Sequence, residues 1–272
     1  MRLLWLNDIH LNFLLGDSVA QFLQRIVELD PEGLLIGGDI GESDTAAGYL
    51  ERIAETLNRP IYFILGNHDY YRGSFAGVNG QIEALCRRVA NLHWLTGEPI
   101  VRLTDRTALI GYETWCDGRC GDYANSRLVL SDFRLIEEFN GLDRDGRLAM
   151  LNRLGDRSAE HFIRVLPAAL EQAERVIALV HAPPFPQAAL HEGRMPGPHW
   201  LAYLVCQAVG DVLLDIMRRN PGKELLVLCG HTHGTGEVRI LDNLRLLTGR
   251  ARYGDAIKQV LTAEESGRII EV

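Results

Sequence analysis

The chain has 272 residues, of which 47% are hydrophobic and 24% are charged. These proportions are typical of a globular domain and exclude a disordered, collagen-like or coiled-coil chain. The 28 basic and 36 acidic residues give a formal charge of -8, which argues against binding to nucleic acid. A chain of this length buries a large core by itself, so we expect a single domain spanning residues 1–272.

The cysteines and the N-terminal segment bear on the compartment of the protein. The 5 cysteines are scattered along the chain without the CxxC spacing of zinc or redox sites. The first apolar run is interrupted by Asn7, Asp8 and His10 before it reaches the length of a signal peptide. No run approaches the roughly 18 apolar residues that cross a bilayer. We therefore expect a cytoplasmic protein with reduced thiols and no membrane partner.

Short apolar runs alternate with stretches of helical period, which is the pattern of an α/β protein. In the first third of the chain we expect strands at 3–6, 34–36 and 61–65, with helices at 18–29 and 46–57 between them. The middle predicts a strand at 107–111, an irregular loop at 117–132, and helices at 147–154 and 158–173. Strands at 176–180 and 225–229 flank a helix at 205–217. The tail predicts antiparallel strands at 238–241, 244–248 and 269–272.

Polar side chains that can bind metal follow the predicted strands directly. They are Asp8, His10, Asp39, Asn67, His68, His181, His231 and His233. Because the carboxyl ends of strands in an α/β sheet meet at one crevice, residues far apart in the sequence are expected to line one pocket. Glycines at the strand ends, such as Gly66 and Gly230, favour tight turns with close backbone approach.

These donor atoms point to a particular kind of metal site. Carboxylates, an amide oxygen and imidazoles suit Mn, Fe or Zn rather than calcium. The set is large enough for two ions that share one carboxylate, and such a pair stabilises a phosphoryl group and its leaving oxygen. We therefore expect two divalent or trivalent metal ions as cofactors.

The motifs resemble the signature blocks of the calcineurin-like metallophosphoesterases. The blocks occur in the family's order, as Asp8-Ile9-His10, Gly38-Asp39, Gly66-Asn67-His68-Asp69, His181 and Gly230-His231-Thr232-His233. The resemblance implies a four-layer α/β/β/α sandwich of two mixed β-sheets flanked by helices, with two metals at the strand ends. The short strands of the tail agree with the second sheet of that fold.

The resemblance also implies roles for individual residues. Asp8, His10 and His233 would bind the first metal, Asn67, His181 and His231 the second, and Asp39 would bridge the two. His68 would protonate the leaving oxygen, a role that suits an imidazole, and Asp69 would orient its ring. The implied activity is hydrolysis of a small phosphodiester or phosphomonoester by hydroxide that the two metals activate.

Two segments are candidates for a substrate loop or cap, around residues 112–135 and 185–203. Tyr70 and Tyr71 are further candidates for the pocket wall, whereas Trp115 is more typical of a core residue. Two positions depart from the family pattern without removing a ligand: Ala182 follows His181, and Asn7 stands where many members have Ser.

Two alternatives remain open beside the hydrolase. A binding scaffold that keeps the fold and binds metal weakly would be expected to lose a ligand or His68, yet all of these positions are filled. A nuclease acting on DNA ends would require a basic groove or an added domain, which the sequence does not indicate. The residues do not distinguish a monoesterase from a diesterase.

Overall fold

The computed structural model describes residues 1–98, 100–191, 193–263 and 268–272, and two mixed β-sheets form its centre. The first sheet has the order β11 (Ile269–Glu271), β1 (Arg2–Leu6), β2 (Gly33–Gly37), β3 (Ile61–Ile64) and β4 (Leu92–Trp94). Strands β1 to β4 run parallel, and β11 pairs with β1 in the antiparallel sense.

The second sheet has the order β5 (Val101–Arg102), β6 (Thr107–Tyr112), β7 (Arg175–Val180), β8 (Glu224–Cys229), β10 (Leu244–Thr248) and β9 (Gly236–Leu241). Its four inner strands are parallel, while β5 and β9 are antiparallel at the two edges. The antiparallel pairing expected for the strands of the tail is therefore confirmed for β9 and β10.

The two sheets pack face to face through alternating side chains. Leu3 and Trp5 of β1 contact the cluster that contains Ile177 and Leu179 of β7, all at most 2% exposed. The intervening residues Leu4 and Leu6 point to the opposite face, against helices. Because side chains on both faces of each sheet are buried, the strands are nearly continuous apolar runs in the sequence.

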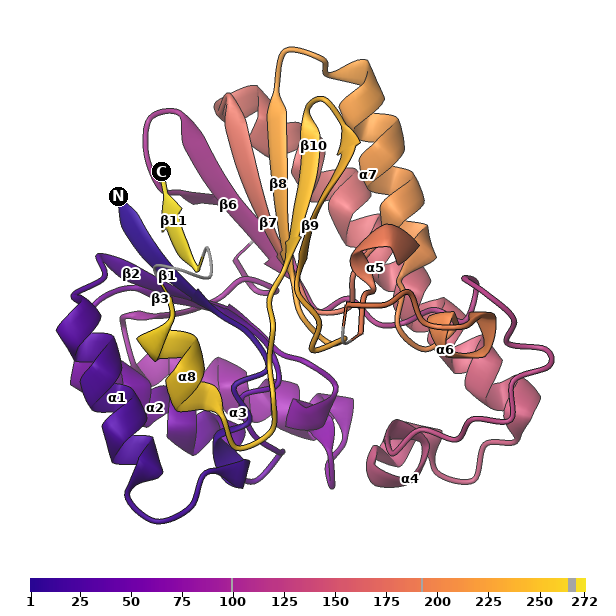
Figure 1. Cartoon of the computed structure of the whole chain (residues 1–272), viewed down its shortest axis with the longest axis horizontal. Coiled ribbons are helices and arrows are strands. Elements are labelled where there is room, and N and C mark those ends of the chain that lie inside the picture. The colour runs from indigo at the N-terminus through magenta and orange to yellow at the C-terminus, as the bar shows by residue number, and fades with distance from the viewer. Residues whose placement is uncertain (99, 192, 264–267) are drawn as a thin grey trace.

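Helices form the two outer layers (Figure 1). Beside the first sheet lie α1 (Ser18–Leu29), α2 (Ala46–Leu57), α3 (Phe75–Arg88) and α8 (Ala256–Leu261), and beside the second lie α5 (Arg144–Gln172) and α7 (Gln207–Arg219). The short helices α4 (Asp132–Leu135) and α6 (Pro198–Leu201) lie in the predicted loop segments. The four-layer sandwich is thus confirmed, and every described helix is too short or too polar to cross a lipid bilayer.

Two sequence expectations were wrong. The helices expected at 147–154 and 158–173 are one helix of 29 residues, α5. Gly155 lies inside it because a Cβ there would be 2.5 Å from the Cβ of Asp117, so this glycine permits a close contact rather than a break. The antiparallel strand expected at 269–272 is present as β11, but it joins the first sheet instead of the second, where Ile270 lies opposite Leu3 and fills the space between the sheets.

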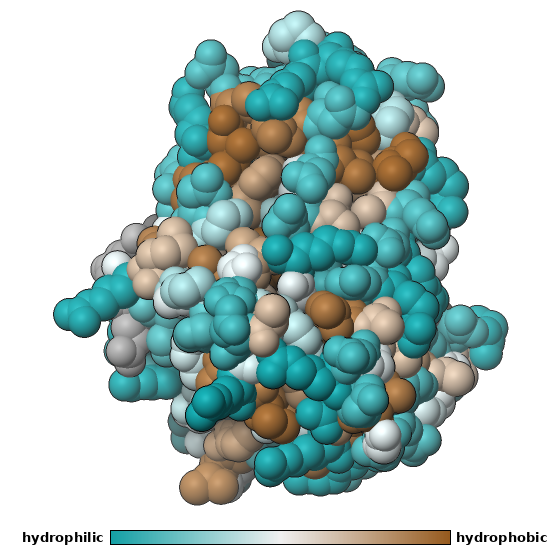
Figure 2. All heavy atoms as spheres, turned by 90° about the vertical axis from the view of Figure 1, so that its right-hand side faces the viewer, coloured by the Kyte–Doolittle hydropathy of each residue, from teal (hydrophilic) through white to brown (hydrophobic). Residues whose placement is uncertain are grey.

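The face that carries the helices of the second sheet is mainly polar. Figure 2, which turns the right-hand side of Figure 1 to the viewer, shows hydrophilic groups over most of this face and separate hydrophobic patches among them. The site described below lies at the strand ends.

Candidate metal centre

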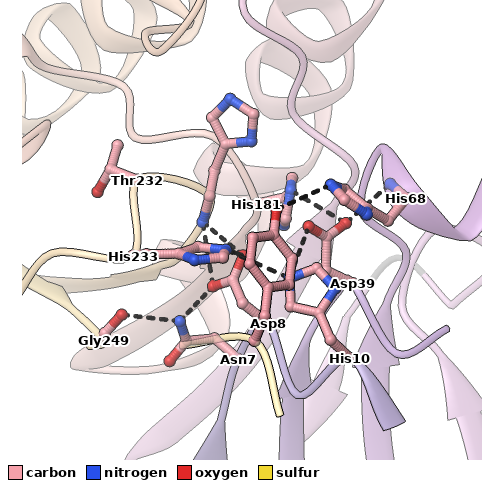
Figure 3. Close-up of polar contacts among 12 residues, drawn as sticks. Asn7, Asp8, His10, Asp39, His68, His181, Thr232, His233 and Gly249 are labelled. Carbon is pink, nitrogen blue, oxygen red and sulfur yellow. Dashed lines mark hydrogen bonds and ion pairs between the residues drawn. The ribbon is translucent and has the colours of Figure 1, made fainter. Parts of the chain in front are cut away.

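Five parallel strands carry the candidate site at their carboxyl ends. From the first sheet, β1 leads to Asp8 and His10, β2 to Asp39 and β3 to Asn67. From the second sheet, β7 leads to His181, and β8 leads to His231 and His233. Figure 3 shows side chains from both sheets pointing toward one another, so the structure brings all seven expected ligands together.

A first cluster consists of Asp8, His10, Asp39 and His233. One donor atom from each lies within 4.8 Å of the others, as in a group that holds a metal ion. Nε2 of His233 is 3.6 Å from Oδ1 of Asp8, and Nε2 of His10 is 3.6 Å from Oδ2 of Asp39. The two Nε2 atoms are only 3.2 Å apart. Since the two carboxylates are at most 1% exposed, a cation is the group that this cluster fits best.

A second cluster consists of Asn67, His181 and His231. Nδ1 of His181 donates to the carbonyl of Gly37 at 3.0 Å, and Nε2 of His231 donates to the carbonyl of Tyr203 at 3.0 Å. A neutral imidazole has a single N–H, so the other nitrogen of each ring has a free lone pair. These nitrogens lie 3.0 Å and 3.1 Å from Oδ1 of Asn67, and three acceptors therefore converge where a cation would satisfy all of them.

The orientation of the Asn67 amide is set by its neighbours. Its Nδ2 donates to the hydroxyl of Tyr71 at 3.2 Å, and that hydroxyl donates to Asp132 at 3.0 Å. The oxygen is consequently the atom that faces the two histidines. The chain of hydrogen bonds holds the amide in the orientation that a metal requires.

Asp39 lies between the two clusters. Its Oδ2 is 3.6 Å from Nε2 of His10 in the first cluster, and its Oδ1 is 3.5 Å from Nε2 of His181 in the second. The backbone N–H of His68 also donates to Oδ1 at 2.9 Å. One carboxylate thus presents one oxygen to each cluster, which is the placement required of a bridging ligand.

The backbone at these positions is strained. Eight non-glycine residues have positive φ in the described part of the chain, and five of them are expected ligands: Asp8, His10, Asp39, His231 and His233. Such conformations persist where the surrounding structure imposes them, and they concentrate at functional sites. Gly66 and Gly230 make room for the carboxylates, because a Cβ at either position would lie 2.2 Å from an oxygen of Asp39 or Asp8.

Burial and crowding shift the pKa values of the site. Burial, together with the charges of Asp8 and Asp69, raises the pKa of Asp39 well above its usual range. Burial and His68 lower the pKa of His10 well below its usual range. Burial alone would raise the pKa of Asp8, but three nearby histidines hold this pKa below its ordinary value. These shifts arise from burial and from the crowding of ionisable groups, and a bound cation would favour neutral imidazoles and charged carboxylates.

His68 lies at the mouth of the clusters. Its ring is 4.6 Å from the His10 ring and 4.2 Å from the Tyr71 ring, and its Nε2 is 3.4 Å from the hydroxyl of Tyr253. Burial and the neighbouring His181 and His231 lower the pKa of His68 to about 3. The free imidazole is therefore neutral at pH 7.

Asp69 does not orient His68 as expected. Its carboxylate accepts backbone N–H groups of Asp39, Ile40, Gly41 and Gly66, at 2.8 to 2.9 Å, and Nδ1 of His68 has no hydrogen-bond partner among the described residues. Burial nevertheless raises the pKa of Asp69 to about 6. Asp69 holds the loops after β2 and β3 together, because backbone N–H groups of both loops donate to its buried carboxylate.

A hollow of about 250 Å³ opens onto the clusters. Its walls include Leu130 to Asp132 from one predicted loop segment, and Trp200 and Tyr203 from the other. Tyr71 lines it as expected, whereas Tyr70 and Trp115 pack together in the core. Sequence reasoning missed Tyr253, which no motif marks and which reaches the site from far along the chain.

Comparison with known proteins identifies the family. The sequence model of the calcineurin-like phosphoesterase family matches residues 1–235 of this chain. The chain therefore belongs to this family, as the motifs implied.

Individual relatives are more distant. A zebrafish (Danio rerio) transmembrane protein with a metallophosphoesterase domain is 38% identical over 91 residues, a stretch that spans 31% of this chain and 20% of that protein. The phosphopantetheinyl hydrolase of Mycobacterium tuberculosis shares the fold with a TM-score of 0.65 and 16% identity, over 99% of this chain and 95% of the other. A dimetal phosphatase from zebrafish has a TM-score of 0.55 and 12% identity, over 91% and 86% of the two chains.

Proposed function

We propose that the protein hydrolyses a small phosphodiester or phosphomonoester at a centre of two metal ions. The first would be held by Asp8, His10 and His233, the second by Asn67, His181 and His231, and both by Asp39. The observation that carries the proposal is the position of Asp39, with one oxygen 3.6 Å from His10 and the other 3.5 Å from His181. Nitrogen and oxygen donors of this kind suit Mn, Fe or Zn.

Two cations, when bound, lower the pKa of water and neutralise the charge of a phosphoryl group. The side chains contribute the remaining chemistry. His68 presents Nε2 at the mouth of the centre, with its ring held between Tyr71 and His10. A bound phosphate ester brings negative charge to this imidazole and raises its pKa, so that Nε2 is protonated and donates to the departing oxygen.

The substrate walls come from three segments that are distant in sequence. The first segment is Leu130 to Asp132, which reaches the first residue of α4. The second contains Trp200 and Tyr203, near the end of α6. The third contributes Tyr253, in the C-terminal part of the chain. Tyr203 also accepts the hydrogen bond from His231 through its carbonyl, so this wall is coupled to a ligand of the centre. Changes in the wall would therefore affect both substrate choice and metal binding.

The test is hydrolysis of matched chromogenic esters, nitrophenyl phosphate and bis-nitrophenyl phosphate, by metal-stripped protein restored separately with Mn²⁺, Zn²⁺, Fe²⁺ and Mg²⁺. Turnover that requires a metal supports the proposal, and the preferred ester assigns a mono- or diesterase. Folded protein with bound metal and no turnover of either ester would favour a binding scaffold instead.

A further inference from the structure

A second, larger hollow of about 800 Å³ lies beside the metal centre. His233, a residue of the first cluster, and Tyr253 line both this hollow and the smaller one over the centre. The two hollows therefore meet at these side chains. The floor of the larger one comes mainly from Arg250 to Thr262, which follow the part of the chain matched by the family model.

The larger hollow is basic although the protein is acidic. Among the described residues its charged walls are Arg250, Arg252, Lys258 and Arg268, with Asp255 as the single carboxylate. The whole chain has a formal charge of -8, so this grouping of cations is against the general trend. A concave surface lined by positive charges raises the local concentration of anions.

Three of the cations are free to bind a ligand. Arg268 is buried, and its guanidinium donates to the carbonyls of Trp5 and Arg250 and to Asn7. Arg250, Arg252 and Lys258 are exposed, and their side chains have no hydrogen-bond or ion-pair partner in the described part of the chain. Elsewhere exposed arginines such as Arg106 and Arg88 pair with glutamates.

We propose that Arg250, Arg252 and Lys258 form a subsite for a second phosphate group of the substrate. This inference rests on the proposed function and names its substrate class: phosphate esters that carry another phosphate beyond the one attacked. The scissile group would lie over the metal centre, and the second phosphate would lie past Tyr253 and His233 in the basic hollow. Arginine and lysine are the usual partners of phosphate, through charge-assisted hydrogen bonds.

The test uses non-hydrolysable probes, so that it does not depend on turnover. Alkane bisphosphonates of increasing chain length are titrated into metal-loaded protein by calorimetry, each beside the monophosphonate of the same length. A chain that spans the two hollows should bind at least about tenfold more tightly than its monophosphonate, which corresponds to one charge-assisted hydrogen bond. Added salt should reduce the gain, because exposed charges are screened.

Variants test whether the tighter binding of the bisphosphonate depends on the residues of the subsite. Arg250→Gln, Arg252→Gln and Lys258→Gln should each reduce the preference for the bisphosphonate and leave monophosphonate binding unchanged. Arg218→Gln on α7 is the matched control, an exposed cation away from the hollow, and should keep the full preference. The subsite is refuted if every bisphosphonate binds like its monophosphonate, or if the variants weaken both probes equally.

Failure of the subsite and failure of the proposed function are distinguishable. Turnover of simple esters with no gain from a second phosphonate would refute the subsite alone. A preference for bisphosphonates in a protein without turnover would keep the subsite and refute the hydrolase. An oligonucleotide that binds more tightly than every bisphosphonate would overturn the assignment to a small substrate.

Discussion

Arg268 donates a hydrogen bond of 2.8 Å from Nη1 to Oδ1 of Asn7, a residue 261 positions earlier in the chain. Asn7 in turn donates through Nδ2 to Oδ2 of Asp8 and to the carbonyl of Gly249. The buried Asn7 thus connects the C-terminal segment to a carboxylate of the metal centre. The tail therefore supports the site as well as closing the first sheet.

This relationship predicts a role for Arg268 in metal binding. Arg268→Gln removes the donor that orients Asn7, and we expect metal affinity to fall by about tenfold to a hundredfold, as for other residues that position ligands. Metal titration with competing chelators measures the effect. At saturating metal kcat should return to near the wild-type value, and Arg268→Lys should restore part of the affinity. An unchanged metal affinity in the folded variant would show that Arg268 serves only to close the sheet.

Asp39 is predicted to be required by both metal ions. Asp39→Asn retains the shape of the side chain but removes the charge that faces His10 and His181, so the content of both ions should fall. Elemental analysis after dialysis against Mn²⁺ measures it. Glu113→Gln is the matched control, a buried carboxylate bound by Trp94, Thr96 and the backbone N–H of Leu65 rather than by a ligand of either cluster, and it should retain both ions. Retention of two ions in Asp39→Asn would exclude the bridging role.

His68 is predicted to act on the leaving oxygen rather than on metal. His68→Ala should lower kcat by about a hundredfold to ten-thousandfold, the usual contribution of general acid catalysis, while the metal content stays near wild type. The loss should be smaller for esters with a good leaving group, such as nitrophenol, than for alkyl esters. His93→Ala, which removes a histidine of β4 that pairs with Glu98 outside both clusters, should leave turnover unchanged. Equal turnover of wild type and His68→Ala on an alkyl ester would refute the acid role.

His161 is predicted to make stability depend on pH. It is buried against Tyr112 and Phe162, and burial, with Arg164, lowers its pKa to about 4. The unfolded chain, in which the pKa is about 6.5, binds a proton more readily, so stability is complete above pH 6.5 and decreases as the pH falls towards 4.

The comparison with His161→Phe isolates this group. Phenylalanine keeps an aromatic ring in the same packing but does not titrate. Urea unfolding of the metal-stripped proteins should show a shallower loss of stability for the variant between pH 6.5 and pH 4, because the remaining histidines titrate alike in both. Parallel curves for the two proteins would contradict the assignment.

The sequence indicated the site well because its signals are local. Asp8, Asp39 and Asn67 directly follow buried apolar runs, and parallel strands bring such ends together. The positive φ values at Asp8 and Asp39 follow from the same tight turns. The roles assigned to these side chains remain predictions, although their convergence is now part of the structure.

Other features depend on contacts that local patterns do not record. The pairing of Ile270 with Leu3 and the approach of Tyr253 to His68 join the two ends of the chain. The orienting role expected of Asp69 was wrong because its carboxylate is satisfied by four backbone N–H groups. The basic hollow was likewise hidden by the overall charge of -8, since net charge does not record which side chains share a surface.

The most direct test of the central claim is a stepwise titration of metal-stripped protein with Mn²⁺, in which bound ions and ester turnover are measured at each step. We predict two ions per chain and turnover that rises mainly as the second ion binds, since Asn67, His181 and His231 form a cluster separate from Asp8, His10 and His233. Full turnover before any metal is added, or two bound ions without turnover of either chromogenic ester, would contradict the account.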